Sequence, residues 1–167
     1  MKRNLLRALS MVFVLLTISC SKDGGGGGTT PTPTVNKSDL LTKPIWKLTA
    51  LTVDPATPVT QGGVAVSNWY AQFGTCSKDD IYKFNVAGTY AFEEGATKCS
   101  PNHPTVWESG TWKFNTTSNV ILMSETGASD YEYKISDLTA TKLLLVREVK
   151  NNSSGIIFTF TYTYAPN

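Results

Sequence analysis

Residues 156–164 read Ile-Ile-Phe-Thr-Phe-Thr-Tyr-Thr-Tyr and carry the clearest structural signal in the chain. Successive side chains of a β-strand point to opposite faces. An extended conformation therefore places Phe158, Phe160, Tyr162 and Tyr164 on one face and three threonines on the other. Aromatic and β-branched residues also favour strands. We predict a strand with one packed face and one solvated face.

The same composition recurs upstream. Runs rich in β-branched and aromatic residues are separated by Gly, Asn, Asp and Ser, which indicates short strands joined by turns. Residues 67–73 fit either a short strand or a helical turn, and no long amphipathic helix is evident. The predicted strands cover residues 45–53, 81–85, 89–94, 106–114, 120–124, 131–138, 142–150 and 156–164.

This pattern predicts an all-β domain with the topology of an antiparallel meander. Such a sheet avoids open edges by closing into a barrel or by folding over as a sandwich. We assign the domain to residues 43–167, a span of about 125 residues, which fits a single domain. A chain of this size buries roughly two-thirds of its unfolded surface.

Cys76 and Cys99 are predicted to form a disulfide. A hairpin centred between Ala87 and Gly88 opposes residues whose numbers add to 175, as those of the two cysteines do. Directly opposed residues lie about 4.5–5.5 Å apart, which a disulfide accepts. The alternative is a pair of free or metal-binding thiols, although no second Cys or His pair could complete a zinc site.

Residues 1–19 have the organisation of an export signal. Three basic side chains precede an apolar stretch over residues 9–18, which is too short to span a bilayer. A serine then precedes Cys20, an arrangement that resembles the lipobox of bacterial lipoproteins, in which the cysteine is lipidated and becomes the mature N-terminus. The alternative is an ordinary secretory signal, with Cys20 discarded or left free.

Residues 20–42 are predicted to form the lipidated cysteine and a flexible stalk, because Gly, Thr, Pro and Ser dominate the segment. After signal removal, twelve basic and thirteen acidic side chains remain, a net charge of −1. No basic cluster is left to follow a phosphate backbone, so nucleic acid is not expected as a partner. The expected partners are a membrane, through the anchor, and a small hydrophobic ligand.

No catalytic residue, metal site or cofactor is predicted. The one histidine, His103, lies in a loop between two nearby prolines, and no nucleophile or orienting acid is evident for it. The adjacent carboxylates Asp79-Asp80 and Glu93-Glu94 would point to opposite faces of a strand. Neither pair could therefore act together on one substrate. We do not expect an enzyme.

Residues 43–164 resemble the lipocalin-like lipoproteins that are common in Bacteroidetes. The supporting motifs are, in chain order, PIWKLT at 44–49, DDIYKF at 79–84, GTY at 88–90, the bracketing cysteines, SGTW at 109–112, ISDLT at 135–139 and LLL at 143–145. The resemblance implies an eight-stranded barrel whose interior is either filled by side chains or holds one small ligand. Whether Arg147 covers Trp46, as a late arginine does in typical lipocalins, is left open.

The expected function is binding of a small apolar or amphipathic ligand by a membrane-anchored lipoprotein of the bacterial outer membrane. The connection at residues 55–66 favours this function, because lipocalins carry a lid there. The alternative is a non-enzymatic surface module with a filled barrel, which contacts protein or glycan through aromatics such as Trp69, Tyr70 and Trp107. Periplasmic and cell-surface orientations are both left open. The candidate ligand-binding residues are Trp46, Trp112, Tyr131, Tyr133, Phe160 and Tyr162.

Overall fold

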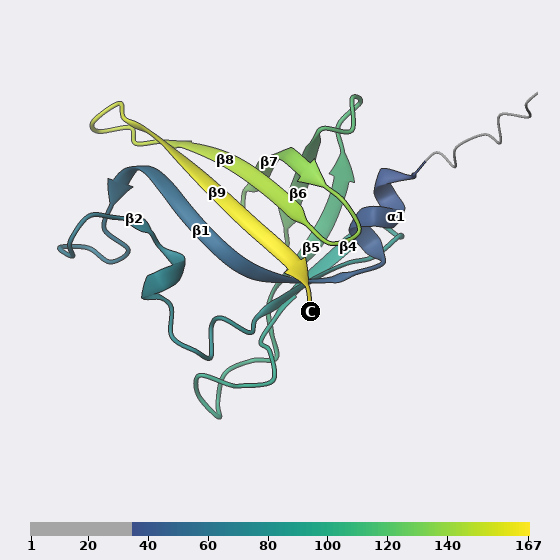
Figure 1. The fold of residues 1–167 in the computed structure, drawn as a ribbon, viewed down its shortest axis with the longest axis horizontal. Helices are drawn as coiled ribbons and strands as arrows, with labels where there is room; N and C mark the ends of the chain where they lie inside the picture. Colours follow the sequence, from purple (N-terminus) through teal and green to yellow (C-terminus); the bar gives the residue numbers. More distant parts are fainter. Residues whose placement is uncertain (1–34) are drawn as a thin grey trace, which may run out of the picture. The chain divides into compact units, whose positions relative to one another are not determined.

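The computed structural model describes residues 35–167, which form an antiparallel β-barrel (Figure 1). The predictions for residues 1–19, for Cys20 and for most of the stalk lie outside the described residues. Within residues 35–167, no helix is long and apolar enough to cross a membrane. The elements are α1 (Lys37–Thr42), β1 (Ile45–Thr57), β2 (Val66–Asn68), η1 (Tyr70–Gln72), β3 (Ile81–Phe84), β4 (Thr89–Glu93), β5 (Val106–Phe114), β6 (Val120–Glu125), β7 (Asp130–Leu138), β8 (Leu143–Lys150) and β9 (Ile157–Pro166).

Eight strands close the barrel. From β3 to β9 each strand pairs antiparallel with the next, and β1 pairs with both β3 and β9. The all-β meander and the lipocalin-like barrel are therefore confirmed, and the sandwich alternative is wrong. The short strand β2 is additional and pairs with the second half of β1. Closure leaves none of the eight strands as a free edge along its whole length.

β1 is longer than predicted, and the connection assigned to residues 55–66 is shorter. The strand continues through Pro55 to Thr57, which pairs with Val66 of β2. Pro55 is tolerated because it lies at an irregularity in the ladder with β2. The ambiguous residues 67–73 contain both expected structures, the end of β2 and the 3-10 helix η1.

The register of the β3–β4 hairpin differs by one residue from the prediction. Asn85 and Thr89 flank a three-residue turn, in which Gly88 has φ 79°. A positive φ at the last position of such a turn favours glycine. The extra turn residue shifts the ladder, so that Ile81 pairs with Glu93 and the paired residue numbers add to 174.

The disulfide between Cys76 and Cys99 is confirmed, with a Cα–Cα distance of 5.1 Å. The reasoning behind the prediction, that the two cysteines oppose each other in the β3–β4 ladder, is wrong. Strand pairing ends at Ile81 and Glu93, so the cysteines lie beyond the ladder in two irregular segments. The bridge therefore joins two loops at one end of the barrel and does not link paired strands.

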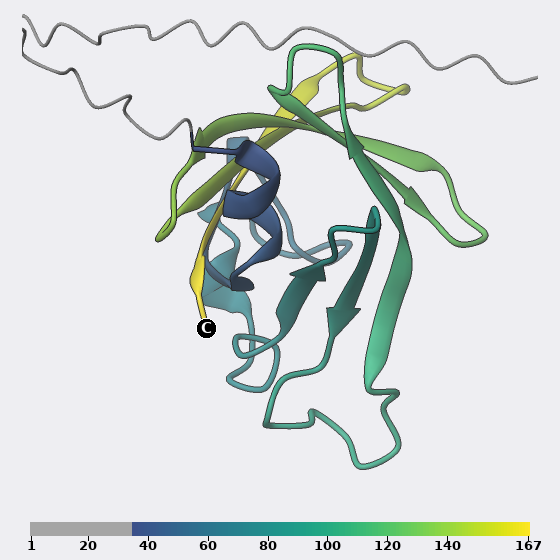
Figure 2. The same ribbon diagram turned by 90° about the vertical axis from the view of Figure 1, so that its right-hand side faces the viewer.

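α1 lies across one end of the barrel (Figure 2) and packs against both β3 and β7. Asn36 caps it by accepting a hydrogen bond from Ser38 N at 2.9 Å. Leu41 is fully buried, and Nε1 of Trp46 donates to its carbonyl oxygen at 2.8 Å. Residues 37–42 thus belong to the folded domain and not to the stalk. Six residues are too few to show an apolar period, which is why this helix was missed.

The end of the barrel that α1 covers is tightly packed. Inward-facing aromatic and aliphatic side chains from seven strands meet there around Leu41, and they leave almost no exposed surface. Large side chains of this kind fill a small barrel completely. The buried cluster consists of Leu41, Trp46, Phe84, Tyr90, Trp112, Ile121, Met123, Leu143, Leu145 and Tyr164.

Candidate functional site

The opposite end of the barrel is less completely filled. Strand register places Tyr131, Arg147 and Phe160 on the inward face of their strands, yet each side chain remains half-buried. The two ends therefore differ: the end under α1, the closed end, is packed, whereas the other, the open end, keeps accessible aromatic and polar groups. A binding site within the barrel can only lie at the open end.

A pocket of about 280 Å³ lies at the open end, on the side formed by β1, β3 and β4. Tyr82 and Phe92 stack with ring centroids 4.6 Å apart and form one wall. Leu48 of β1 forms another wall. The remaining lining residues come from the segment that precedes β3 and are Phe73, Ser77 and Asp80.

Residues 69–80 cover this end of the barrel. The Trp69 ring packs edge-on against Phe160, with centroids 5.1 Å apart, and its Nε1 donates to Thr57 O at 3.0 Å. The disulfide at Cys76 then ties the segment to the loop that follows β4. The segment that covers the pocket is therefore the one after β2. Of the residues predicted to form a lid, 55–57 belong to β1, and none of residues 55–66 lines this pocket.

A belt of polar side chains lines the middle of the barrel. Tyr90 Oη donates to Glu108 at 2.5 Å, and Tyr131 Oη donates to Glu125 at 3.2 Å. Burial raises the pKa of Tyr90 well above its ordinary value, and the hydrogen bond to Glu108 adds to the rise. The tyrosines are therefore neutral donors at neutral pH, and polar groups face the lumen among the aromatic rings.

Arg147 belongs to this belt. Its guanidinium lies 4.4 Å from the ring centroid of Tyr131 and 5.8 Å from that of Tyr133, in cation–π geometry. The question left open by the sequence is thereby answered: Arg147 does not cover Trp46, which is covered by α1. Arg147 supplies a positive charge on the lumen wall formed by β7 and β8.

Asp80 lines the loop side of the pocket, and the carboxylates of Asp79 and Glu94 lie near enough to influence its charge. Asp80 accepts a hydrogen bond from Gly95 N at 3.2 Å, and Glu94 accepts one from Cys99 N at 2.8 Å. Burial raises the pKa of Asp80; the Gly95 hydrogen bond opposes this, and the charges of Asp79 and Glu94 reinforce it. These carboxylates accept hydrogen bonds from backbone N–H groups of residues 95, 97 and 99.

His103 packs against the same loop. Its Nδ1 lies 3.4 Å from Glu94 Oε1, and its ring is 4.8 Å from that of Trp107. No nucleophile completes a triad among these contacts. Across residues 35–167, no group of three or more His, Cys, Asp or Glu side chains is arranged to hold a metal ion.

The six predicted ligand-binding residues all face the interior but do not form one wall. Trp46 and Trp112 fill the closed end, where Trp112 Nε1 donates to Asn85 O at 3.1 Å. The other four are half-buried: Tyr131, Tyr133, Phe160 and Tyr162. Of these, Tyr131, Tyr133 and Tyr162 pack against the buried cluster. None of the six is among the residues that line the pocket of about 280 Å³.

Sequence reasoning missed all six residues that line the pocket. Tyr82 and Phe92 lie in predicted strands, and the alternation there could have placed them on the inward face. Phe73 and Asp80 come from irregular backbone, and no local pattern indicates that they turn back over the barrel.

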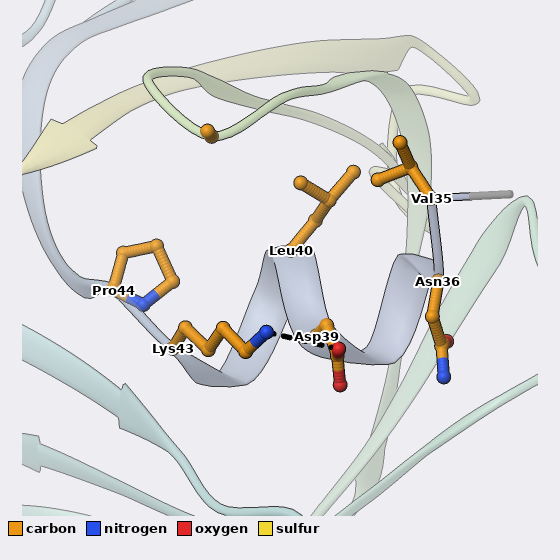
Figure 3. Close-up of a pocket in the computed structure, with 7 residues that line it drawn as sticks. Val35, Asn36, Asp39, Leu40, Lys43 and Pro44 are labelled. Carbon is orange, nitrogen blue, oxygen red and sulfur yellow. Dashed lines mark hydrogen bonds and ion pairs between the residues drawn. The ribbon is translucent and has the colours of Figure 1, made fainter. Parts of the chain in front are cut away.

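A second, larger pocket of about 390 Å³ lies on the outside of the barrel beside α1 (Figure 3). Val35, Leu40 and Pro44 form its apolar surface, and the ion pair between Lys43 and Asp39 spans 3.0 Å at its side. It shares no residue with the barrel interior, so we do not include it in the candidate site.

The closed eight-stranded antiparallel barrel defines an up-and-down β-barrel protein. A family model described as the lipocalin-like domain matches residues 45–145, from the start of β1 into β8. The chain belongs to this family. No curated protein matches the chain.

Two solved structures of a bovine protein resemble the chain. One is a deswapped triple mutant of bovine odorant binding protein, which is 13% identical to this chain with a TM-score of 0.42. The alignment covers 77% of this chain and 74% of the bovine chain. The other is bovine odorant binding protein in complex with a selenium-containing odorant, which is 12% identical with a TM-score of 0.43. Here the alignment covers 88% of this chain and 78% of the bovine chain. At these values neither similarity supports an argument about function.

Proposed function

We propose that this protein binds a small apolar or amphipathic molecule at the open end of its barrel, and that a lipid on Cys20 anchors it to a bacterial outer membrane. The observation that carries the binding proposal is the asymmetry of the interior. One end is packed under α1, whereas the other holds a pocket of about 280 Å³ with aromatic and aliphatic walls. Ligand pockets are typically concave, apolar and furnished with a few polar groups.

The polar belt favours an amphipathic ligand over a purely apolar one. Glu108 and Glu125 each accept one tyrosine hydrogen bond and have further acceptor capacity. Burying such groups without partners is unfavourable, so they are suited to contact with a polar part of a ligand or with water. Apolar rings of Phe92 and Phe160 on the same lumen would contact the rest of the molecule.

Titration with a neutral apolar fluorophore tests the binding proposal. The barrel and its core lie entirely within the compact unit of residues 34–167, so residues 22–167 are a suitable soluble form. N-phenyl-1-naphthylamine should bind saturably, with enhanced fluorescence. Phe73→Ala should weaken binding about tenfold, because it removes a large apolar contact from the pocket wall without disturbing the core.

Trp107→Ala is the matched control, because Trp107 is an exposed aromatic on β5 that does not line the pocket. It should leave fluorophore binding unchanged. Absence of saturable binding to the folded wild-type protein would contradict the proposal and favour the filled barrel.

A surface interaction module remains the second candidate, supported by one exposed cluster. Trp107 and Val106 are 40% and 44% exposed, and His103 packs beside the tryptophan. The other two aromatics named for this role are less available. Trp69 packs on Phe160, and Lys78 lies 5.1 Å above the ring of Tyr70.

The anchor proposal rests on the resemblance of the residues before Cys20 to a lipobox, together with the export signal of residues 1–19. In bacteria grown with an alkyne-bearing fatty acid, the full chain should incorporate the label and fractionate with the outer membrane. Cys20→Ala should abolish both, whereas Ser21→Ala should retain them. Label in the Cys20→Ala chain would contradict the assignment.

A further inference from the structure

We infer that the pocket at the open end selects a small amphipathic cation, such as an arylalkyl ammonium ion, whose charged group lies at the Asp80 carboxylate. This inference rests on the proposed binding function and adds the charge of the ligand. It is drawn from the charges around the pocket, from the partners of Asp80 and from the aromatic character of the walls.

The charged side chain that lines the pocket is a carboxylate, and no cationic side chain lines it. Asp80 lines it directly, and Glu108 lies opposite Phe92 in the β4–β5 ladder, next to the wall. No lysine, arginine or histidine is among the lining residues. Arg147 is on the β8 wall, where its guanidinium stacks on Tyr131. An anionic ligand in this pocket would therefore meet like charges, whereas a cation would meet opposite ones.

Asp80 has an uncompensated negative charge. Its carboxylate accepts one hydrogen bond, from Gly95 N, and makes no ion pair with any side chain of the part of the chain described here. The nearby cationic side chains are engaged elsewhere: Lys78 lies over the Tyr70 ring, and Lys98 donates to His103 O. A ligand cation would supply the missing partner.

The carboxylates behind Asp80 strengthen this requirement. Glu94 is 6% exposed, and its Oε2 has no hydrogen-bond partner; Asp79 Oδ1 is likewise buried and unpartnered. Within residues 35–167, His103 is the one basic side chain at ion-pair distance from Glu94, at 3.4 Å. The three acids thus give the loop side of the pocket a negative potential that the protein itself compensates only in part.

The remaining walls fit the rest of such a ligand. The rings of Tyr82 and Phe92 stack at 4.6 Å, and Phe73 and Leu48 complete an apolar lining. Aromatic faces attract an ammonium group through their quadrupole and also bury a hydrocarbon body. A volume of about 280 Å³ suits one small ring with a short chain better than a long acyl chain.

Three probes of matched shape and different charge test the inference. Isothermal titration of residues 22–167 with 2-phenylethylamine, 2-phenylethanol and 3-phenylpropanoate should show the amine binding at least about tenfold tighter than the other two, since a desolvated ion pair adds affinity. In Asp80→Asn, which keeps the acceptor for Gly95 N, affinity for the amine should fall to that of the alcohol.

Asp137→Asn is the matched control. Asp137 pairs with Lys142 at 3.2 Å near the closed end and does not line the pocket, so all three affinities should be retained. Circular dichroism would verify that both variants are folded. The comparison of the three probes on the wild-type protein does not depend on either variant.

Two results would overturn the inference in distinguishable ways. If the alcohol binds as tightly as the amine, or if Asp80→Asn leaves the amine unaffected, selection of a cation at Asp80 is wrong while the binding function stands. If none of the three probes binds and N-phenyl-1-naphthylamine also fails to bind, the proposed function is wrong, and the inference fails with it.

Discussion

At Gly110, strands β5 and β6 approach so closely that a Cβ atom would lie 2.0 Å from Ser124 O. Gly110→Ala would force the two strands apart in the middle of the barrel wall. We expect loss of more than about 4 kcal/mol of stability, or failure to fold, as measured by urea denaturation and soluble yield.

Gly127→Ala is the control for this prediction. Gly127 lies in the β6–β7 turn with φ 84°, and nothing lies within 4 Å of its Cβ position. A left-handed conformation costs a non-glycine residue about 1–2 kcal/mol, so this variant should fold with a modest loss. Equal effects at the two positions would contradict the close approach at Gly110.

Asp80 makes the stability of the protein depend on pH. Burial raises its pKa above the ordinary value of 3.8, so the folded state holds the proton more tightly than the unfolded chain does. Stability contributed by the protonated form is complete below pH 3.8 and is lost as pH rises through the folded-state pKa. Asp80→Asn should therefore stabilise the protein at pH 7 and not at pH 3.

The expected gain at pH 7 is a few tenths of a kcal/mol, because Asp80 is partly exposed and its interactions are screened. Thermal unfolding of the variant and the wild type at both pH values would measure it. A gain of the same size at pH 3 would attribute the effect to packing and contradict the electrostatic account.

Among the elements, α1 closes one end of the barrel with only six residues. It places Leu41 in the core and covers Trp46, whereas its neighbour Leu40 faces the outer pocket. Leu41→Ala should cost about 2–5 kcal/mol, as expected for a buried leucine. Leu40→Ala should cost clearly less, because Leu40 is only half-buried.

Urea denaturation midpoints of Leu41→Ala and Leu40→Ala would measure the two losses of stability. Equal losses would mean that α1 does not pack on the barrel as described. A truncation that begins at residue 43, where we first placed the domain boundary, is expected to be less stable than either variant, because it removes the closure of the barrel end entirely.

For the whole molecule, the disulfide links the covering segment to the rest of the open end. Cys76 and Cys99 are 23 residues apart, and closing a loop of this size contributes about 3 kcal/mol in the chain-entropy model. Reduction should lower stability by about that amount and weaken fluorophore binding. The barrel should remain, because neither cysteine lies in the core.

Residues 22–167 contain only these two cysteines, so alkylation can be read as a mass change. The untreated protein should gain no alkyl group, and the reduced protein should gain two. Labelling without reductant would contradict the bridge. Unchanged fluorophore affinity after reduction would show that the bridge does not support the covering segment.

The sequence predicted the strands well because the signal for a strand is local. In Phe158, Phe160, Tyr162 and Tyr164, alternation and composition together identify β9, and the observed register confirms that these residues share a face. The register of β3–β4 was not predictable at the same level. It depended on whether Gly88 ends a two-residue or a three-residue turn, and the sequence allows both.

By itself, the sequence determined the all-β antiparallel meander, because alternation and turn residues are local signals. It also determined the partners of the disulfide, because Cys76 and Cys99 are the only cysteines after Cys20. Only the tertiary structure decided which end is filled, how α1 covers Trp46 and how Asp80 and Phe73 reach a pocket with Leu48. These features come from contacts between segments far apart in sequence. Packing in a closed barrel is settled by the volumes of all the side chains together, and no local pattern encodes that sum.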